Sequence, residues 1–201
     1  MSYLKNYVLI FSLLLLSSCR IIGYHDGYNQ LSRQNQNKVE KTSAPIGELA
    51  CDNKIYVVSE EQISNYLEQC DSAIVFRWIP YCPYTITPQE FEQFCDENNY
   101  KPVIVQTCYC RQSFTLFNAV HTPLLFPDIE KYGTKTVYKY IEKFQVALTG
   151  DLKPEYAFWV FNKGKFNRYM RDEEIKKCCS IKKGKPFFKI KSSLKFNKNR
   201  I

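Results

Sequence analysis

Short apolar runs alternate with amphipathic stretches along the chain between about Cys51 and Cys179. Runs rich in β-branched and aromatic residues predict buried strands at 54–58, 73–78, 102–107 and 156–161, with a hairpin partner at 165–169. Apolar positions three and four residues apart predict helices after Ser59, from Cys82 to about Glu97, over 137–148 and over 172–179. Strands that alternate with helices and end in a hairpin predict an α/β fold with a mixed central sheet and helices on both faces.

The polar composition of residues 19–50 differs from that of the predicted domain. Asn, Gln, Ser and Lys dominate this segment, and apolar residues show little periodicity. Such a composition cannot bury enough surface to offset the entropy of ordering the chain. We therefore expect a flexible tether over 19–50 and one folded domain over 51–180. The segment 108–136 within that domain shows no clear period.

Positive charge is concentrated at the end of the chain. Residues 181–201 contain eight Lys and Arg residues and no acidic residue, a surplus equal to the net charge of +8 for the whole chain. Because the rest of the chain is balanced, this is not the pattern of a globally basic nucleic-acid-binding protein, and we expect no nucleic-acid partner. The basic tail could contact lipid head groups or acidic polymers, although such a run is more commonly a solvated end.

The first 18 residues have the features of a targeting segment. Lys5 precedes an apolar run over 7–16, which is too short to span a bilayer. The run ends in Leu16-Ser17-Ser18-Cys19, which resembles the bacterial lipobox. The resemblance implies that residues 1–18 are removed and that Cys19 carries lipid. The expected location is then the cell envelope, with the protein anchored in a membrane and facing the periplasm or the cell exterior. The alternative is an ordinary secretory signal with an incidental cysteine.

Nine cysteines are a high number for a chain of 201 residues. An exported protein meets an oxidising compartment, so disulfides are permitted. With Cys19 lipidated, eight remain, and their pairing cannot be read from the sequence. Cys70 and Cys95 fall on apolar helix faces and are most simply small core residues. The two histidines, His25 and His121, lack metal-ligand spacing, so we expect no metal site and no cofactor.

One cysteine follows directly on the most apolar predicted strand. The strand at 73–78 leads into a stretch with Trp78, Pro80 and Tyr81 before Cys82. Prolines end a strand by breaking its hydrogen-bond ladder. Cys82 is therefore predicted to lie where a buried strand gives way to a helix. The start of a helix favours negative charge, which would lower the pKa of the Cys82 thiol.

This stretch resembles the active site of the thioredoxin family, whose pattern is Trp-x-x-x-Cys-x-x-Cys. It reads Trp78-Ile79-Pro80-Tyr81-Cys82-Pro83-Tyr84-Thr85, with Thr85 in place of the second cysteine. Cys-Pro-Tyr-Thr is also similar to the Cys-Pro-Tyr-Cys of glutaredoxins. Further along, Phe161-Asn162-Lys163-Gly164 matches the family's Phe-x-x-Gly hairpin. The resemblance covers about 54–179, with an insertion between Cys108 and Thr136. It implies a thioredoxin-like three-layer α/β/α fold.

The resemblance also implies roles for particular residues. Cys82 would be the catalytic nucleophile, with Trp78, Pro80, Tyr81, Pro83 and Thr85 as its active-site neighbours. A single cysteine needs a second thiol to complete the exchange, and Cys108, Cys110 or an external thiol could supply it. Cys108 and Cys110, two residues apart at a strand end, could both face Cys82. Tyr156 takes the position of the family's cis-proline, and Thr122-Pro123 is a second partial match.

Three functions follow as hypotheses. The first is thiol–disulfide exchange through Cys82 by a lipid-anchored protein, with protein thiols or disulfides as partners. The second is a redox-inactive thioredoxin-fold module that binds or scaffolds a partner, since Thr85 and Tyr156 replace two residues important to the family's chemistry. The third is a purely structural, disulfide-rich lipoprotein, which leaves the Trp78-to-Cys82 stretch unexplained.

Overall fold

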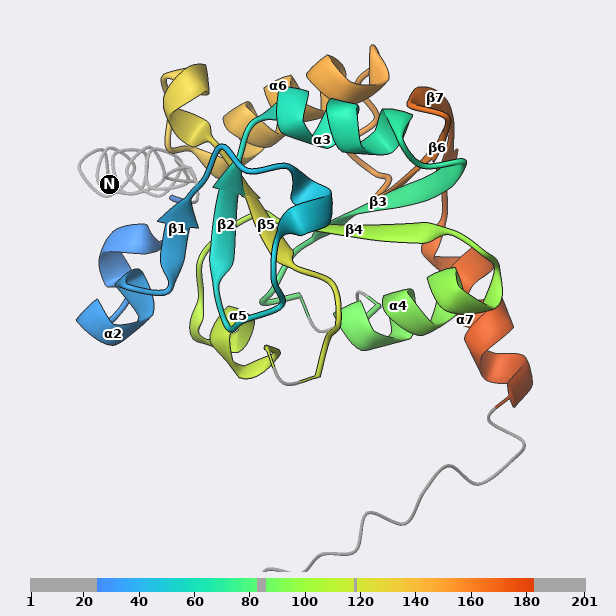
Figure 1. Cartoon of the computed structure of the whole chain (residues 1–201), viewed down its shortest axis with the longest axis horizontal. Helices are drawn as coiled ribbons and strands as arrows, with labels where there is room; N and C mark the ends of the chain where they lie inside the picture. The colour runs from blue at the N-terminus through green and yellow to red at the C-terminus, as the bar shows by residue number, and fades with distance from the viewer. Residues whose placement is uncertain (1–24, 83–85, 118, 183–201) are drawn as a thin grey trace, which may run out of the picture.

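A single mixed sheet organises the protein. The computed structural model describes residues 25–82, 86–117 and 119–182 (Figure 1). The sheet has seven strands in the order β1-β2-β5-β4-β3-β6-β7. The first five strands in this order are parallel, and β6 and β7 are antiparallel to their neighbours. The strands are β1 Val39–Lys41, β2 Ile55–Val58, β3 Ser72–Trp78, β4 Lys101–Gln106, β5 Leu124–Pro127, β6 Phe158–Asn162 and β7 Lys165–Met170.

Helices cover both faces of this sheet. Figure 1 shows α3 and α6 over one face and α4 and α7 over the other, which makes three α/β/α layers. The α-helices are α2 Arg33–Gln36, α3 Glu60–Glu68, α4 Pro88–Glu97, α5 Arg111–Thr115, α6 Val137–Thr149 and α7 Asp172–Lys182. Three short 3₁₀ helices are η1 Tyr28–Gln30, η2 Ile46–Glu48 and η3 Ile129–Tyr132. No helix among the described residues is both long enough and apolar enough to cross a bilayer.

The core has one apolar layer on each side of the sheet because successive strand residues point to opposite faces. On β3, Phe76 and Trp78 pack towards α4, whereas Val75 packs on the other side. The rings of Phe76 and Phe158 stack with their centroids 4.5 Å apart. Cys70 and Cys95 are buried in these layers, which confirms them as core residues. Strands covered on both faces read as continuous apolar runs, as β3 does.

The starts of α3 and α4 are set by the same local device. Ser59 caps α3 by accepting the N–H of Gln62, and the Gln62 side chain accepts the N–H of Ser59. Thr87 and Glu90 form the same reciprocal pair at the start of α4. Each pair satisfies two backbone donors that a helix leaves unpaired.

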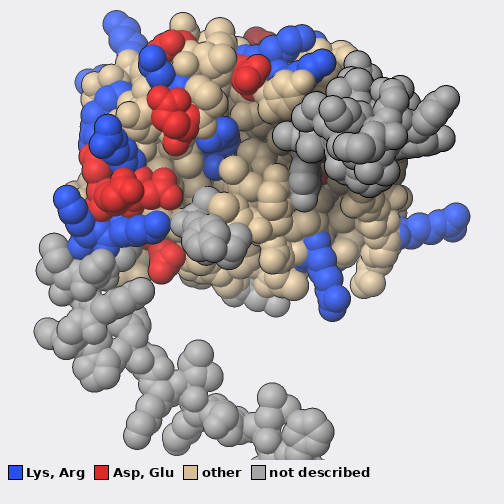
Figure 2. Space-filling view, turned by 180° about the vertical axis from the view of Figure 1, so that it is seen from behind, with Lys and Arg blue, Asp and Glu red and all other residues tan. Residues whose placement is uncertain are grey.

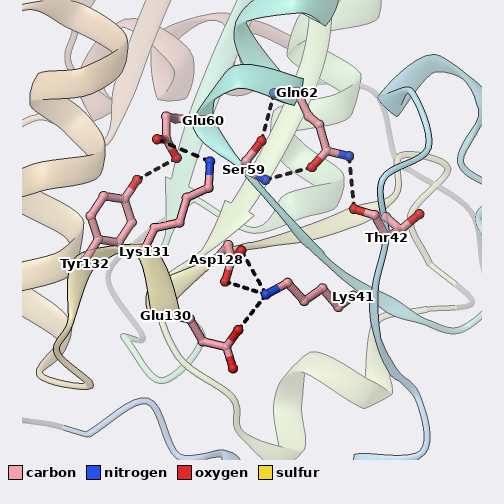
Figure 3. A network of polar contacts seen from close by, with 9 residues as sticks. All are labelled: Lys41, Thr42, Ser59, Glu60, Gln62, Asp128, Glu130, Lys131 and Tyr132. Atoms are coloured by element: carbon pink, nitrogen blue, oxygen red, sulfur yellow. Dashed lines mark hydrogen bonds and ion pairs between the residues drawn. The ribbon is translucent and has the colours of Figure 1, made fainter.

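Residues 25–50 are part of the folded unit, which corrects the prediction of a flexible tether over 19–50. Strand β1 extends the sheet by pairing in parallel with β2. Lys41, at the end of β1, binds Asp128 at 3.1 Å and Glu130 at 2.6 Å, as Figure 3 shows. The side chain of Gln62 also donates to the carbonyls of Thr42 and Ala44. Composition was a poor guide because the few apolar residues of this segment, such as Ile46 and Val39, pack on the core, while backbone pairing and polar contacts attach the rest.

Within the rest of the domain, the predicted strands and helices are confirmed to within a few residues. The exception is the helix predicted from Cys82, which begins at Pro88. The segment 108–136, which had no clear period, contains α5, β5 and η3. Strand β5 lies between β2 and β4, so this segment adds a parallel strand to the middle of the sheet.

Candidate functional site

The carboxyl ends of the five parallel strands lie along one edge of the sheet. In open α/β sheets this edge is where ligands bind. Chain segments 79–82 and 107–111 leave the sheet here side by side, since the Thr107 N–H donates to the Trp78 carbonyl at 2.9 Å. The cysteines of the two segments are therefore carried by neighbouring strands, β3 and β4.

Cys82 lies at the end of a tight turn. Its N–H donates to the carbonyl of Ile79 at 3.1 Å, which closes a four-residue turn with Pro80 in the second position. Proline favours that position because its fixed φ matches the turn. The turn carries the chain away from β3 and leaves the Cys82 side chain partly exposed.

The prediction that Cys82 begins the following helix is wrong. Helix α4 begins at Pro88, six residues later, where Thr87 and Glu90 form the cap. Cys82 is thus not in the first turn of α4, although Thr87 and Pro88 at the start of that helix line the same pocket as Cys82. Pro83 and Thr85, two predicted neighbours of Cys82, lie outside the described residues.

Cys82 borders a pocket of about 230 Å³. One wall is the end of β3 with its turn, and the opposite wall is α5 and the residue after it. None of the described residues that line this pocket is an acid or a base apart from the thiol itself. They are Trp78, Pro80, Cys82, Ile86, Thr87, Pro88, Gln112, Thr115 and Leu116. Two of the predicted neighbours, Trp78 and Pro80, thus lie with Cys82, whereas Tyr81 is exposed outside this lining.

The two candidate resolving cysteines have different surroundings. Cys108 is buried, and burial raises the pKa of its thiol to about 12. Cys110 is partly exposed at the start of α5, with its sulfur 3.9 Å from Oε1 of Gln112. Gln112 lines the Cys82 pocket, so Cys110 adjoins a wall of that pocket. The reason for expecting both side chains to face Cys82 does not hold, because β4 ends at Gln106 and strand alternation does not continue beyond it.

Tyr156 is near β3 in the sheet, but its side chain is not part of the Cys82 pocket. The next residue, Ala157, accepts the N–H of Arg77 at 2.7 Å. The Tyr156 ring stacks on Tyr169, with 5.2 Å between centroids. It lines a separate hollow of about 420 Å³ with Arg171 and other charged residues at the start of α7. Figure 2 shows acidic and basic side chains gathered at this end of the molecule.

The peptide bonds of the described residues are all trans, including the bond before Pro123. Neither predicted match to the family's cis-proline, at Tyr156 or at Pro123, therefore has that conformation. The described residues also contain no group of three or more His, Cys, Asp or Glu side chains arranged to hold a metal ion.

Sequence reasoning missed several residues around the pocket. The wall formed by Gln112, Thr115 and Leu116 belongs to a helix of only five residues, which is too short to show a periodic pattern. Gln106 lies opposite Trp78 in the register of β3 with β4 and is fully buried. Its side-chain amide has no hydrogen-bond partner among the described residues. The sequence signal for a buried polar residue was this glutamine at the end of a run of Val and Ile.

A buried carboxylate also fixes the chain beyond α5. Glu92, on α4, accepts the N–H of His121 at 2.9 Å and that of Thr122 at 2.6 Å. The nearby thiol of Cys51 donates to the carbonyl of Val120 at 3.2 Å, and burial raises its pKa. These contacts hold the segment that leads into β5.

No family model, no curated protein and no solved structure matches the chain. The chemistry of the site is therefore inferred from its geometry.

Proposed function

We propose that the chain is a lipid-anchored cell-envelope protein whose thioredoxin-like domain carries out thiol–disulfide exchange through Cys82. The observation that carries the proposal is the position of this thiol. It is partly exposed beside a neutral pocket at the carboxyl edge of the sheet. Cys95 and Cys108 are buried, and burial raises the pKa of both thiols, which makes them poor nucleophiles.

The order of elements supports the family resemblance. Cys82 follows the buried strand β3 and precedes α4 and β4. Strands β6 and β7 form the later hairpin, with Gly164 at positive φ in its turn, and α7 follows. Strand β5 comes from the segment that the resemblance treats as an insertion.

The proposed reaction has two steps. The Cys82 thiolate attacks one sulfur of a substrate disulfide, forms a mixed disulfide and releases the other sulfur as a thiolate. A second thiolate then resolves the mixed disulfide. An external thiolate attacks the substrate sulfur and releases the Cys82 thiolate. Alternatively, Cys110 attacks the Cys82 sulfur, releases the substrate thiolate and leaves a Cys82–Cys110 disulfide that external thiols reduce. Cys108 is less suited because a thiol with a pKa of about 12 is almost fully protonated near neutral pH.

A second candidate function is binding without turnover. It is favoured by Thr85 in place of the second cysteine and by the trans peptide bonds at both positions matched to the cis-proline. In that case the pocket beside Cys82 would hold a side chain of a partner protein, and the thiol would be a lining residue only.

The first test compares the reactivity of individual thiols. The full-length protein is treated with a chromogenic aromatic disulfide, and mass spectrometry identifies the modified cysteines over time. Exchange is expected to be about tenfold faster at Cys82 than at Cys51, an exposed thiol outside the pocket. Cys82→Ser should remove the fast phase, and Cys51→Ser should keep it. A Cys82 that reacts no faster than Cys51 would refute the exchange proposal.

Turnover separates exchange from binding. With reduced glutathione in excess, a protein that exchanges disulfides should reduce a glutathionylated model peptide repeatedly. Wild-type protein should exceed Cys82→Ser in this assay by at least about tenfold. Rapid labelling of Cys82 without turnover would support the binding module instead.

A further inference from the structure

The folded unit begins much closer to Cys19 than its sequence indicates. His25, the first described residue, pairs with Thr136 in an isolated antiparallel bridge. Asp26 is buried, and its carbonyl accepts the N–H of Tyr109. A side chain at position 27 would collide with the backbone of Tyr109, because a Cβ there would lie 2.4 Å from its carbonyl oxygen. The chain is thus held against the domain at residues 25–27.

This start sets an upper limit on the distance between a lipid on Cys19 and the domain. Six residue steps separate Cys19 from His25. At about 3.3–3.6 Å for each extended residue, they span at most about 20 Å. A tether that reached to residue 51 would have allowed about 110 Å. An anchored protein therefore has its Thr136 region held near the bilayer surface.

The exposed residues around Thr136 have the chemistry of a membrane interface. Tyr138 is 55% exposed, the largest value among the exposed large hydrophobic side chains of the described residues. Lys135 and Lys139 are exposed beside it, and Nζ of Lys139 lies 5.9 Å from the centre of the Tyr138 ring. Helix α6 contains one acidic residue, Glu142, which lies one turn after Tyr138. Tyrosine favours the head-group region, and lysine is attracted to anionic lipids.

We propose that Lys135, Tyr138 and Lys139 form a surface that rests on anionic lipid head groups when Cys19 is anchored. We call these three residues the anchor-side surface. The inference depends on the lipid anchoring proposed above and not on the redox activity of Cys82. It specifies the occupant of this surface as a bilayer with anionic lipid.

The test measures the protection of single lysines in the full-length lipidated protein. The protein is reconstituted into vesicles of phosphatidylcholine with phosphatidylglycerol, and into nonionic detergent as a reference. A brief pulse of an amine-acetylating ester is followed by mass spectrometry. Lys135 and Lys139 should be acetylated at least about threefold more slowly on the vesicles. Lys163 and Lys165, in the hairpin at the opposite edge of the sheet, should react at equal rates in both.

Two changes should weaken the protection. High salt screens exposed charges. In 0.5 M sodium chloride the Debye length falls below about 5 Å, so the protection of Lys135 and Lys139 from acetylation should decrease. Tyr138→Ala removes the exposed ring, and Lys135 and Lys139 should then react faster on vesicles. Because Tyr138 is exposed, this variant should fold normally, as a matching circular dichroism spectrum would show.

The outcomes distinguish this inference from the anchoring itself. If the protein floats with the vesicles and Lys135 and Lys139 react as fast as in detergent, the anchor-side surface is refuted while anchoring stands. If wild-type protein fails to float, as Cys19→Ser should, then anchoring is refuted and this inference falls with it.

Discussion

The carboxylate of Glu92 provides the sharpest test of the packing around the site. It is 8% exposed, and it is the shared acceptor for the N–H groups of His121 and Thr122. Glu92→Ala leaves both donors without this partner. Hydrogen bonds to a charged group contribute about 1.5–3 kcal/mol each, and the relief of burying a charge offsets part of that loss. Since His121 is exposed and water can reach part of this loop, we expect a net loss of about 2 kcal/mol.

Urea denaturation followed by tryptophan fluorescence would measure this loss, since Trp78 and Trp159 are both buried in the native state. With a slope of about 2 kcal/mol per molar urea, the midpoint of Glu92→Ala should fall by about 1 M. Glu92→Gln keeps an acceptor oxygen and should lose about half as much. The exposed Glu61→Ala should stay within about 0.5 kcal/mol of wild type. A Glu92→Ala midpoint within about 0.2 M of wild type would refute the role of the carboxylate as a structural acceptor.

Three further predictions concern stability. Burial raises the pKa of the Cys108 thiol to about 12 from an unfolded value of 9.0, so the unfolded chain releases this proton first. The free energy of unfolding should therefore fall as pH rises above about 9, by up to about 1.4 kcal/mol per pH unit, and urea titrations at pH 8 and 10 should show a smaller fall for Cys108→Ala. Gly164→Ala should lower the melting temperature more than Gly133→Ala, because both have positive φ but only the Cβ at 164 meets Glu68, 3.0 Å from its Cα; equal losses would contradict the steric part of this reasoning. Ser59→Ala removes one half of the α3 cap and should cost about 1 kcal/mol in urea titrations, and an unchanged midpoint would show that the cap is dispensable.

The strands in the middle of the sheet were predictable because burial on both faces leaves a clear apolar run. β3 and β4 carry such runs, and each of their bounds lies within one residue of the predicted one. β5 has only four residues, follows Pro123 and ends with Pro127, so its signal resembled that of a loop. β1 is three residues long with exposed Glu40 and Lys41, and its pairing depends on backbone groups that every sequence shares.

The candidate site was predictable on one side only. Trp78, Pro80 and Cys82 form a single local stretch, and the structure brings all three to one pocket. The opposite wall comes from α5, which lies about thirty residues further along the chain and is positioned by the register of β4 beside β3. Tyr156 was placed by counting back from a hairpin, which located the backbone near β3 but could not determine where its ring packs.

The buried thiols have a consequence for measuring local motion in this protein. Cys95 lies under α4 on one side of the sheet, and Cys70 follows α3 on the other. A thiol reagent can reach Cys95 only when α4 separates from the sheet, so its labelling rate under native conditions reports the free energy of that opening. The slow labelling of Cys70 would report the opposite layer in the same sample. The protein thus carries a natural probe of local unfolding on each side of its sheet.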